Sequence, residues 1–254
     1  MYRLPQTNHP LDFPDDIITT PEGLLAVGGN LHPLTLINAY AKGIFPWFSK
    51  NDPTLWWHPD PRLVIFPESV HLSRRMSQIL KKISLPSKLA TLRKGQKAPY
   101  NVTLNKAFHD VIKECASKRG KGRESTWITQ DMITSYIKLH EMKFAHSVEV
   151  WNQKKKLVGG MYGVSMGRVF FGESMFSHES NTSKIALYWL CDLLKMNDFV
   201  LLDCQIVSDH LKRLGATEIS SQKFMEYLVK GETYRKRESV YRLSSIVYRL
   251  ASSV

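Results

Sequence analysis

Two carboxylates and one amide follow apolar runs in the second half of this sequence. Glu173 follows residues 169–171, while Asp203 follows residues 199–202 and precedes Gln205 by two positions. A strand that uses its apolar residues in a core and ends in an acid brings that acid to a sheet edge, where α/β proteins commonly form active sites. Either acid alone is more often a cap of the next loop, but the pair beside Gln205 favours catalysis. We therefore predict Glu173, Asp203 and Gln205 as catalytic residues at one rim of one sheet.

The elements that would carry these residues show a change of period near residue 145. Apolar residues upstream recur at helical spacing, whereas those downstream are typical of short strands. Three strands joined by tight turns should form an antiparallel meander, and a helix, a strand, a helix, a strand and a helix should follow. The strands are expected at 146–151, 156–164 and 168–173, and the later elements at 181–196, 199–203, 208–214, 216–219 and 222–229. This order resembles the N-acyltransferase fold of the acetyltransferase superfamily.

The rest of the chain is predicted to add a small domain in front of this fold. Residues 1–62 are rich in proline, glycine and aromatic residues, and the periodicity there predicts one short helix over 33–42. Residues 63–230 would form the N-acyltransferase-like catalytic domain, so the fold class is α+β. Residues 231–254 would be a C-terminal tail, either an amphipathic helix or poorly ordered. Inside the catalytic domain, further helices are expected at 71–82, 103–117 and 129–142, with a basic loop at 83–100. Thr129 should cap the last of these helices, whose apolar face would hold Met132, Ile133, Tyr136 and Leu139.

The positive charge of the chain is concentrated in one segment. Residues 71–123 carry 14 Lys and Arg against two Asp and Glu, a net charge of +12 that equals the net charge of the whole chain. Such a block is often only a solvated face, but its concentration favours contact with a polyanion such as RNA. Four cations on the predicted helix are expected to contact phosphates without reading sequence, namely Arg74, Arg75, Lys81 and Lys82.

Composition argues against several other function classes. No run of 18 or more apolar residues occurs, so we expect no membrane span, and the first 14 residues lack the pattern of a secretory signal. The three cysteines (Cys115, Cys191 and Cys204) lack metal-type spacing and are typical of reduced thiols in a cytoplasmic protein. The histidines are scattered, so no metal site is predicted.

Coenzyme A is not expected as the acyl donor. Acetyltransferases hold its pyrophosphate in a glycine-rich loop at a helix start. The corresponding stretch here, residues 173–180, contains no glycine and two acids, Glu173 and Glu179, which would repel a diphosphate. We therefore predict no cofactor and a different activated acyl donor.

Several motifs, in order along the chain, resemble the leucyl/phenylalanyl-tRNA–protein transferase family. Near the N-terminus they are GLLAVGGN (23–30), GIFPWF (43–48) and WWHPDPR (56–62). Later in the chain they are TWI (126–128), AHSVEVW (145–151), LVGGMYG (157–163), GESMFS (172–177) and DCQ (203–205). Each motif alone is weakly specific, but so many in order over residues 13–228 make a specific resemblance.

The resemblance implies transfer of leucine or phenylalanine, and less readily methionine, from an aminoacyl-tRNA to a protein whose N-terminal residue is lysine or arginine. The product would enter the bacterial N-degron route of protein degradation. The implied partners are therefore charged tRNA and such proteins, with no membrane, and the protein is expected to act as a monomer in the cytoplasm. The basic segment and an acyltransferase fold without a coenzyme A loop agree with this reading.

The resemblance also assigns chemical roles to the three polar residues. Asp203 and Gln205 match a pair proposed to relay the proton of the attacking α-amine. Because an amide is a poor base, we expect Gln205 to orient the amine and Asp203 to act as its electrostatic partner, with a tRNA ribose hydroxyl as a shuttle. Glu173 matches a site acid that would hold the cationic terminus of the acceptor.

Four further positions match substrate contacts of the family. Met161 and Phe170 match the apolar pocket of the donor side chain, and Trp47 and Trp127 match residues that stack around the terminal adenosine. Taken alone, all four would be read as ordinary core residues. The chain departs from the family by having His178 in place of Arg, His58 in place of Ser, and an apparent insertion at 83–98.

Two other functions are compatible with the sequence. One is an aminoacyl-tRNA-dependent transferase of the peptidoglycan-bridge type, although such enzymes usually carry two copies of the fold and this chain has room for one. The other is a non-catalytic RNA-binding protein that kept the fold. That protein would not need Asp203, Gln205 and Glu173 together.

Overall fold

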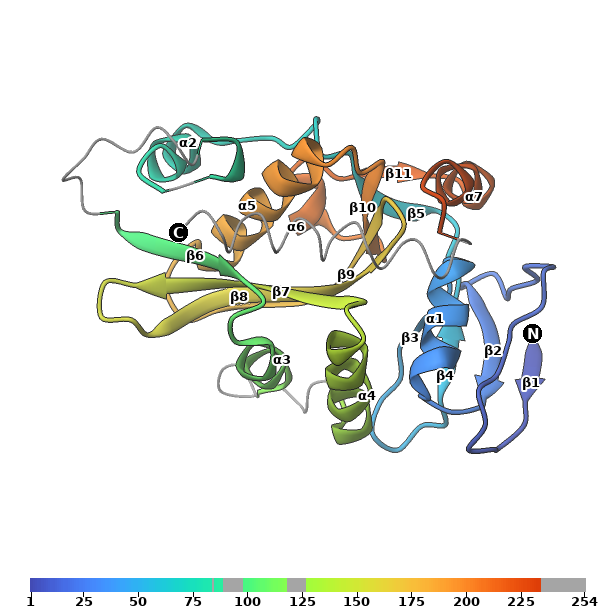
Figure 1. The fold of residues 1–254 in the computed structure, drawn as a ribbon. Helices are drawn as coiled ribbons and strands as arrows, with labels where there is room; N and C mark the ends of the chain where they lie inside the picture. The colour runs from blue at the N-terminus through green and yellow to red at the C-terminus, as the bar shows by residue number, and fades with distance from the viewer. Residues whose placement is uncertain (84, 89–97, 118–126, 234–254) are drawn as a thin grey trace.

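Two β-sheets and the helices around them form this chain, as seen in a computed structural model (Figure 1). The structure describes residues 1–83, 85–88, 98–117 and 127–233. The predicted C-terminal tail beyond residue 233 and most of the predicted basic loop lie outside the described residues. The predicted fold class, α+β with a small N-terminal unit in front of a larger one, is confirmed.

The first sheet belongs to the N-terminal unit and has the strand order β1-β2-β4-β3. Its strands are β1 (Tyr2–Leu4), β2 (Leu24–Gly28), β3 (Phe45–Pro46) and β4 (Leu55–Trp57). The sequence did not reveal these strands because each has two to five residues, too few for a period to be read. Helix α1 (Pro33–Ala41) was predicted, and it begins with a proline in its first turn after the His32 cap.

The second sheet has seven strands in the order β11-β5-β10-β9-β8-β7-β6. They are β5 (Arg62–Ile65), β6 (Tyr100–Leu104), β7 (Ala145–Asn152), β8 (Leu157–Met166), β9 (Val169–Ser177), β10 (Leu201–Gln205) and β11 (Thr217–Ile219). Strands β6 to β9 are antiparallel neighbours, and β10 returns parallel to β9 after a helix. The predicted order of meander, helix, strand, helix and strand is therefore confirmed.

One prediction in this region was wrong, and one strand was missed. The helix expected over 103–117 is only α3 (Phe108–Ala116), because residues 100–104 form β6 and pair with β7. Strand β5 was not predicted at all, although it pairs with both β10 and β11. In both cases pairing with a strand far along the chain decides the conformation, and no local pattern carries that information.

Helices cover both faces of the large sheet (Figure 1). On one face lie α2 (Arg74–Leu80) and α5 (Thr182–Met196), and on the other lie α3 and α4 (Gln130–Glu141). Thr129 caps α4 as predicted, since its side chain accepts a hydrogen bond from the Met132 amide. The remaining helical segments are the 3₁₀ turn Pro86–Lys88, α6 (Asp209–Lys212) and α7 (Ser221–Lys230).

Alternate side chains along each strand enter two different cores. Phe170 and Leu202 belong to the apolar cluster beneath α5, whereas Phe171 and Leu201 belong to the cluster that also holds α3 and α4 residues. Successive strand residues face opposite sides of a sheet. Asp203 therefore shares its face with Leu201 and Phe171, on the side of α3, α4 and the N-terminal unit.

Candidate active site

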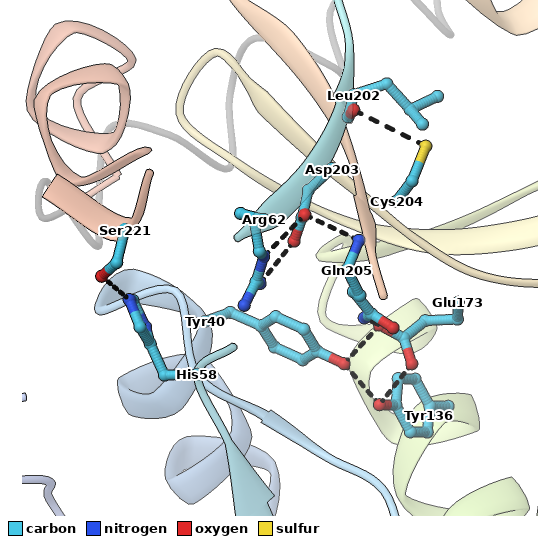
Figure 2. A network of polar contacts seen from close by, with 10 residues as sticks. All are labelled: Tyr40, His58, Arg62, Tyr136, Glu173, Leu202, Asp203, Cys204, Gln205 and Ser221. Atoms are coloured by element: carbon cyan, nitrogen blue, oxygen red, sulfur yellow. Dashed lines mark hydrogen bonds and ion pairs between the residues drawn. The ribbon is translucent and has the colours of Figure 1, made fainter. Parts of the chain in front are cut away.

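A buried ion pair joins the two strands β5 and β10. Arg62 donates from Nε and Nη2 to the two oxygens of Asp203, at 2.8 and 2.6 Å, and neither residue is exposed to solvent (Figure 2). The guanidinium also lies over the rings of Phe45 and Phe224, with its Cζ 4.8 and 4.4 Å from their centroids. This bidentate geometry, with two aromatic rings against the guanidinium, is a strong way to hold a carboxylate.

Gln205 is held by that carboxylate at a bulge in β10. Its backbone N–H donates to Asp203 Oδ1 at 2.9 Å, and its φ of 67° lies in the left-handed region. The register of β10 against β5 shifts between Asp203 and Gln205. With an extended backbone, the Gln205 side chain would follow the regular alternation of side chains along the strand. The bulge turns it toward Glu173 instead, and Gln205 Nε2 donates to Glu173 Oε1 at 2.8 Å (Figure 2).

Glu173 accepts hydrogen bonds from three different elements. Besides Gln205 of β10, Tyr40 of α1 donates to Oε1 at 2.7 Å and Tyr136 of α4 donates to Oε2 at 3.0 Å. The two tyrosine hydroxyls also contact each other. The carboxylate thus lies where the N-terminal unit, helix α4 and strand β10 meet, as Figure 2 shows.

The surroundings of Glu173 change its acidity. Burial raises the pKa of Glu173 to about 7, and the charge of Asp203 adds to the rise, while the hydrogen bonds from Tyr40, Tyr136 and Gln205 oppose it. The residue keeps some exposed surface, but its carboxylate is buried, and the effect of burial on the pKa outweighs that of the three hydrogen bonds. A carboxyl group of this kind exchanges its proton near neutral pH, which suits acid–base chemistry.

The structure brings the three predicted catalytic residues together, but the two acids do not lie at strand ends. Strand β9 continues beyond Glu173 to Ser177, and β10 continues beyond Asp203 to Gln205. The prediction that each acid closes its strand was therefore wrong. The acids meet because β9 and β10 are parallel neighbours with Asp203 opposite Phe171. Polar side chains are tolerated inside these strands because each has hydrogen-bond partners.

Met161 and Phe170 lie in the core beneath α5. They are 3% and 1% exposed, and both belong to the apolar cluster on that face of the sheet. Met161 Cε lies 3.9 Å from where a Cβ on Gly172 would stand, so it reaches the strand that carries Glu173. Their assignment to a donor pocket stays a prediction.

The two predicted adenosine contacts differ in exposure. Trp47 is 39% exposed, with its ring 5.7 Å from that of Trp57, whereas Trp127 is partly buried against the core. Their sequence neighbours, Phe48 and Ile128, border one cavity of about 960 Å³ between the N-terminal unit and α4. The two tryptophans therefore stand on segments that face the same hollow.

The four predicted phosphate contacts lie on the surface. Arg74, Arg75, Lys81 and Lys82 occupy α2 and the turn after it, and all four are exposed. None of them forms an ion pair with a described residue. The helix thus presents unneutralised cations to solvent, while much of the remaining basic segment falls outside the described residues.

The two departures from the family occupy different environments. His178 is exposed, and its Nε2 lies 2.8 Å from Glu114 Oε2. His58 is buried with Nε2 2.8 Å from Ser221 Oγ, and burial, together with the charge of Arg62, lowers the pKa of His58 to about 3. His58 is therefore neutral at physiological pH and supports the packing of α7.

Sequence reasoning missed three members of the site. Arg62 was quoted within a motif but given no role, although it is the counter-ion of Asp203. Tyr136 was assigned to an apolar helix face, and Tyr40 lay within a predicted helix. The Asp-Pro-Arg motif could have suggested Arg62, but nothing local distinguishes these tyrosines from core residues.

Neither a metal nor a membrane segment is evident where the chain is described. No group of three or more His, Cys, Asp or Glu residues in the described ranges could hold a metal ion. Of the helices described, none has the length and apolar character needed to cross a bilayer.

Two sequence comparisons with known proteins agree with each other. Sequence models of the leucyl/phenylalanyl-tRNA protein transferase family match residues 64–229 and, for its N-terminal domain, residues 29–60. A leucyl/phenylalanyl-tRNA–protein transferase of Klebsiella pneumoniae is 46% identical over 91% of this chain and 92% of its own length. One of Cellvibrio japonicus is 48% identical over 86% and 87%. Among solved structures, L-PGS from Bacillus licheniformis has a TM-score of 0.37 at 8% identity, over 73% of this chain and 57% of that one, which is too low to support an argument.

Proposed function

The chain belongs to the leucyl/phenylalanyl-tRNA protein transferase family, and from this premise we propose that it moves leucine or phenylalanine from an aminoacyl-tRNA to the N-terminal lysine or arginine of acceptor proteins. As a member of the family it is an aminoacyltransferase that uses aminoacyl-tRNA as donor and a protein as acceptor. The proposal further includes weaker use of methionine, action as a monomer in the cytoplasm, and delivery of the product to N-degron degradation.

The observation that carries the proposal is the hydrogen-bonded series Arg62–Asp203–Gln205–Glu173. Gln205 donates through Nε2 to Glu173, and its Oε1 accepts no hydrogen bond from a described side chain or amide. That oxygen is free to accept a hydrogen bond from the incoming α-amine. Asp203 then acts as a positioning residue, because its carboxylate contacts Arg62 and the Gln205 backbone rather than the Gln205 side-chain amide.

The proposed reaction is aminolysis of an ester. The neutral α-amine of the acceptor attacks the carbonyl carbon of the aminoacyl ester, a C–N bond forms, and the bond from that carbon to the ribose oxygen breaks. One proton leaves the amine, and the ribose oxygen takes up a proton. Gln205 orients the neutral amine, and ionised Glu173 attracts the cationic side chain of the acceptor's N-terminal lysine or arginine. Because an aminoacyl ester is already activated, positioning supplies much of the acceleration.

Four residues would contact the donor. Met161 and Phe170 would border the leucyl or phenylalanyl side chain, which is supported by the approach of Met161 to the strand of Glu173. Trp47 and Trp127 would stack around the terminal adenosine, which is supported by the cavity that their neighbours share. Stacking of this kind contributes about 1–3 kcal/mol per base.

The first test is transfer of radiolabelled leucine from charged tRNA to two peptides that differ only in starting with Arg or with Ala. We expect label in the Arg peptide alone. Label in neither peptide, with tRNA still bound, would contradict the proposal and favour the non-catalytic RNA-binding protein. Label only in a cell-wall precursor amine would favour the peptidoglycan-bridge type of transferase.

Charge reversal on α2 tests the RNA-binding part of the proposal. Arg74→Glu with Arg75→Glu should raise the KM for charged tRNA and flatten its salt dependence, because two phosphate contacts are lost. Lys195→Glu reverses an exposed charge in the last turn of α5 and should change neither quantity. An unchanged salt slope in the α2 variant would remove this helix from the RNA site.

A further inference from the structure

A small cavity lies between α2, α5 and α6, on the α5 face of the large sheet. Its volume is about 180 Å³, below the roughly 300–1,000 Å³ of pockets that enclose a drug-sized molecule. The cavity therefore suits one small polar group, and not a whole nucleotide base with its sugar.

Positive side chains from three elements border this cavity. Arg75 comes from α2, Lys184 from α5 and Arg213 from the end of α6. The rest of the lining is His71, His210 and uncharged residues, and it contains no described Asp or Glu. In the described parts of the chain, no carboxylate forms an ion pair with any of the three permanent cations. Three unneutralised cations around one small hollow create a strongly positive local potential.

Two of these cations, Lys184 and Arg213, both affect the acidity of His210. The pKa of His210 is lowered first by burial and then by the charges of Lys184 and Arg213. Two residues that lie 29 positions apart in the sequence thus repel a proton on one imidazole ring. The lining is a cluster of mutually repelling positive charges, which an anion would relieve.

The N-terminus of α5 opens into the cavity. Its cap residue Asn181 lines the hollow, adopts a φ of 70° and makes no side-chain capping hydrogen bond, and Lys184 lies in the first turn. A helix of 15 residues carries a partial positive charge at this end. Glu179, which we expected to repel phosphates here, instead accepts hydrogen bonds from Tyr100 and Asn152, at 3.0 and 2.8 Å.

We propose that this cavity is a phosphate subsite, and that it holds one backbone phosphate of the donor RNA. The assignment of this phosphate to the donor RNA rests on the proposed function. Guanidinium groups of Arg75 and Arg213 and the ammonium of Lys184 are suited to phosphate oxygens. His210 follows Gln205 by five residues on the segment that leaves β10. A phosphate held here would therefore fix the RNA close to the end of β10 where Gln205 stands.

The test compares binding of uncharged tRNA by three forms of the full chain over a series of salt concentrations. Lys184→Gln with Arg213→Gln should weaken binding about tenfold near 0.1 M salt and reduce the salt slope by about 1. Lys195→Gln removes one charge from the other end of α5 and should behave as wild type. Lys184→Arg with Arg213→Lys keeps the charges and should also bind as wild type. If this variant binds as weakly as the Gln variant, the loss of affinity comes from misfolding and not from the lost charges. Equal affinity and slope in the Gln variant would overturn the proposal.

A second arm identifies the source of the phosphate. Short RNAs of the acceptor 3′ end would each carry one uncharged methylphosphonate at a successive position. At one position wild type should lose about tenfold in affinity while the Lys184→Gln, Arg213→Gln variant loses nothing further. The absence of any such position would overturn the RNA assignment. Displacement of a bound reporter by inorganic phosphate or coenzyme A, but not by RNA, would overturn it as well.

Failure of this inference is distinguishable from failure of the proposed function, because RNA binding is measured without transfer. If one methylphosphonate position weakens binding by wild type but not by the variant, and the protein transfers no amino acid, the subsite is supported and the proposed reaction is contradicted. If the protein transfers leucine normally but no such methylphosphonate position exists, the reaction is supported and the subsite is contradicted.

Discussion

At the scale of single residues, the site depends on charges that are buried and paired. Removing an ion such as Asp203 or Arg62 from water is costly, and the cost is recovered only when geometry and hydrogen bonds are good. Here the guanidinium donates two hydrogen bonds to the carboxylate, which accepts a third from the backbone N–H of Gln205. The pair therefore stabilises one backbone position, and its energetic role can be separated from its chemical role by mutation.

Removing one partner of this pair should be more harmful than removing both. Asp203→Ala leaves a buried, unpaired guanidinium and should lower the free energy of unfolding by about 3–5 kcal/mol. Arg62→Leu with Asp203→Leu should recover much of that loss, since no buried charge is left alone. Urea unfolding measures both values.

Transfer should be lost in both variants, because Gln205 has lost the acceptor that holds its backbone. In the folded double variant, tRNA binding should stay close to that of wild type. If binding falls in parallel with transfer, or if the double variant transfers normally, Asp203 does not position Gln205.

The acidity of Glu173 predicts a pH dependence. Because the folded-state pKa of about 7 lies above the ordinary value of 4.5, the folded protein binds a proton more tightly than the unfolded chain does. The stabilising contribution is full below pH 4.5 and is lost as pH rises through 7, by about 3 kcal/mol at most. Glu173→Gln should remove this slope, which urea unfolding at pH 5 and pH 8 would measure.

The same ionisation should appear in the kinetics. If ionised Glu173 attracts the acceptor, kcat/KM for transfer to an Arg peptide should rise through an apparent pKa near 7. The Glu173→Gln variant should be slow and should lose the rise near 7, so that only the later rise from deprotonation of the peptide α-amine, near pH 8, is left. A profile that keeps its midpoint near 7 in the variant would assign the ionisation to another group.

At the scale of elements, the end of β10 is built as a bulge with a residue in the left-handed region. A side chain other than glycine at a φ of 67° costs about 1–2 kcal/mol. The Gln205 amide reaches Glu173 only because the backbone turns there. Local strain is thus retained at the position where the side chain is needed.

Two substitutions separate the strain from the chemistry of Gln205. Gln205→Ala and Gln205→Gly both remove the amide, so both should lose most transfer activity. Gln205→Gly should be the more stable of the two by about 1 kcal/mol, because glycine adopts positive φ without steric cost. Chemical denaturation would measure the difference, and equal stabilities would show that the bulge relaxes when the amide is absent.

At the scale of the whole molecule, the site is shared between the N-terminal unit and the large sheet. Tyr40 from α1 donates to Glu173 of β9, and the N-terminal unit is also joined to α7 by the contacts of His58 and Asp60 with Ser221. Figure 1 shows α1 standing between its own small sheet and the seven-stranded sheet. The site is therefore complete only when both parts are folded together.

This arrangement predicts that a substitution in the N-terminal unit changes the acidity of a residue in the large sheet. The Tyr40 hydroxyl lowers the pKa of Glu173 by hydrogen bonding, so Tyr40→Phe should move the midpoint of the transfer profile above 7. Tyr136→Phe should act in the same direction. Tyr162→Phe is a matched control, since that buried hydroxyl has no hydrogen-bond partner among the described residues, and the midpoint of this variant should not move. A downward shift with Tyr40→Phe would contradict the assignment.

The sequence by itself determined the order of elements and much of the core. Its periodicity gave the meander β7 to β9, helix α5, strand β10 and the cap of α4, because these features depend on residues a few positions apart. It also singled out Glu173, Asp203 and Gln205, since acids after apolar runs stand out locally. The resemblance to a family rested on the same short motifs.

Only the tertiary structure decided how these residues work. Arg62 reaches Asp203 across 141 positions, and Tyr40 reaches Glu173 across 133. It also decided that β9 and β10 continue beyond their acids and that Gln205 turns at a bulge. Local periodicity records which face of an element is apolar, but not which distant element covers that face. A tyrosine or an arginine on such a face is read as core until the fold shows the charge beside it.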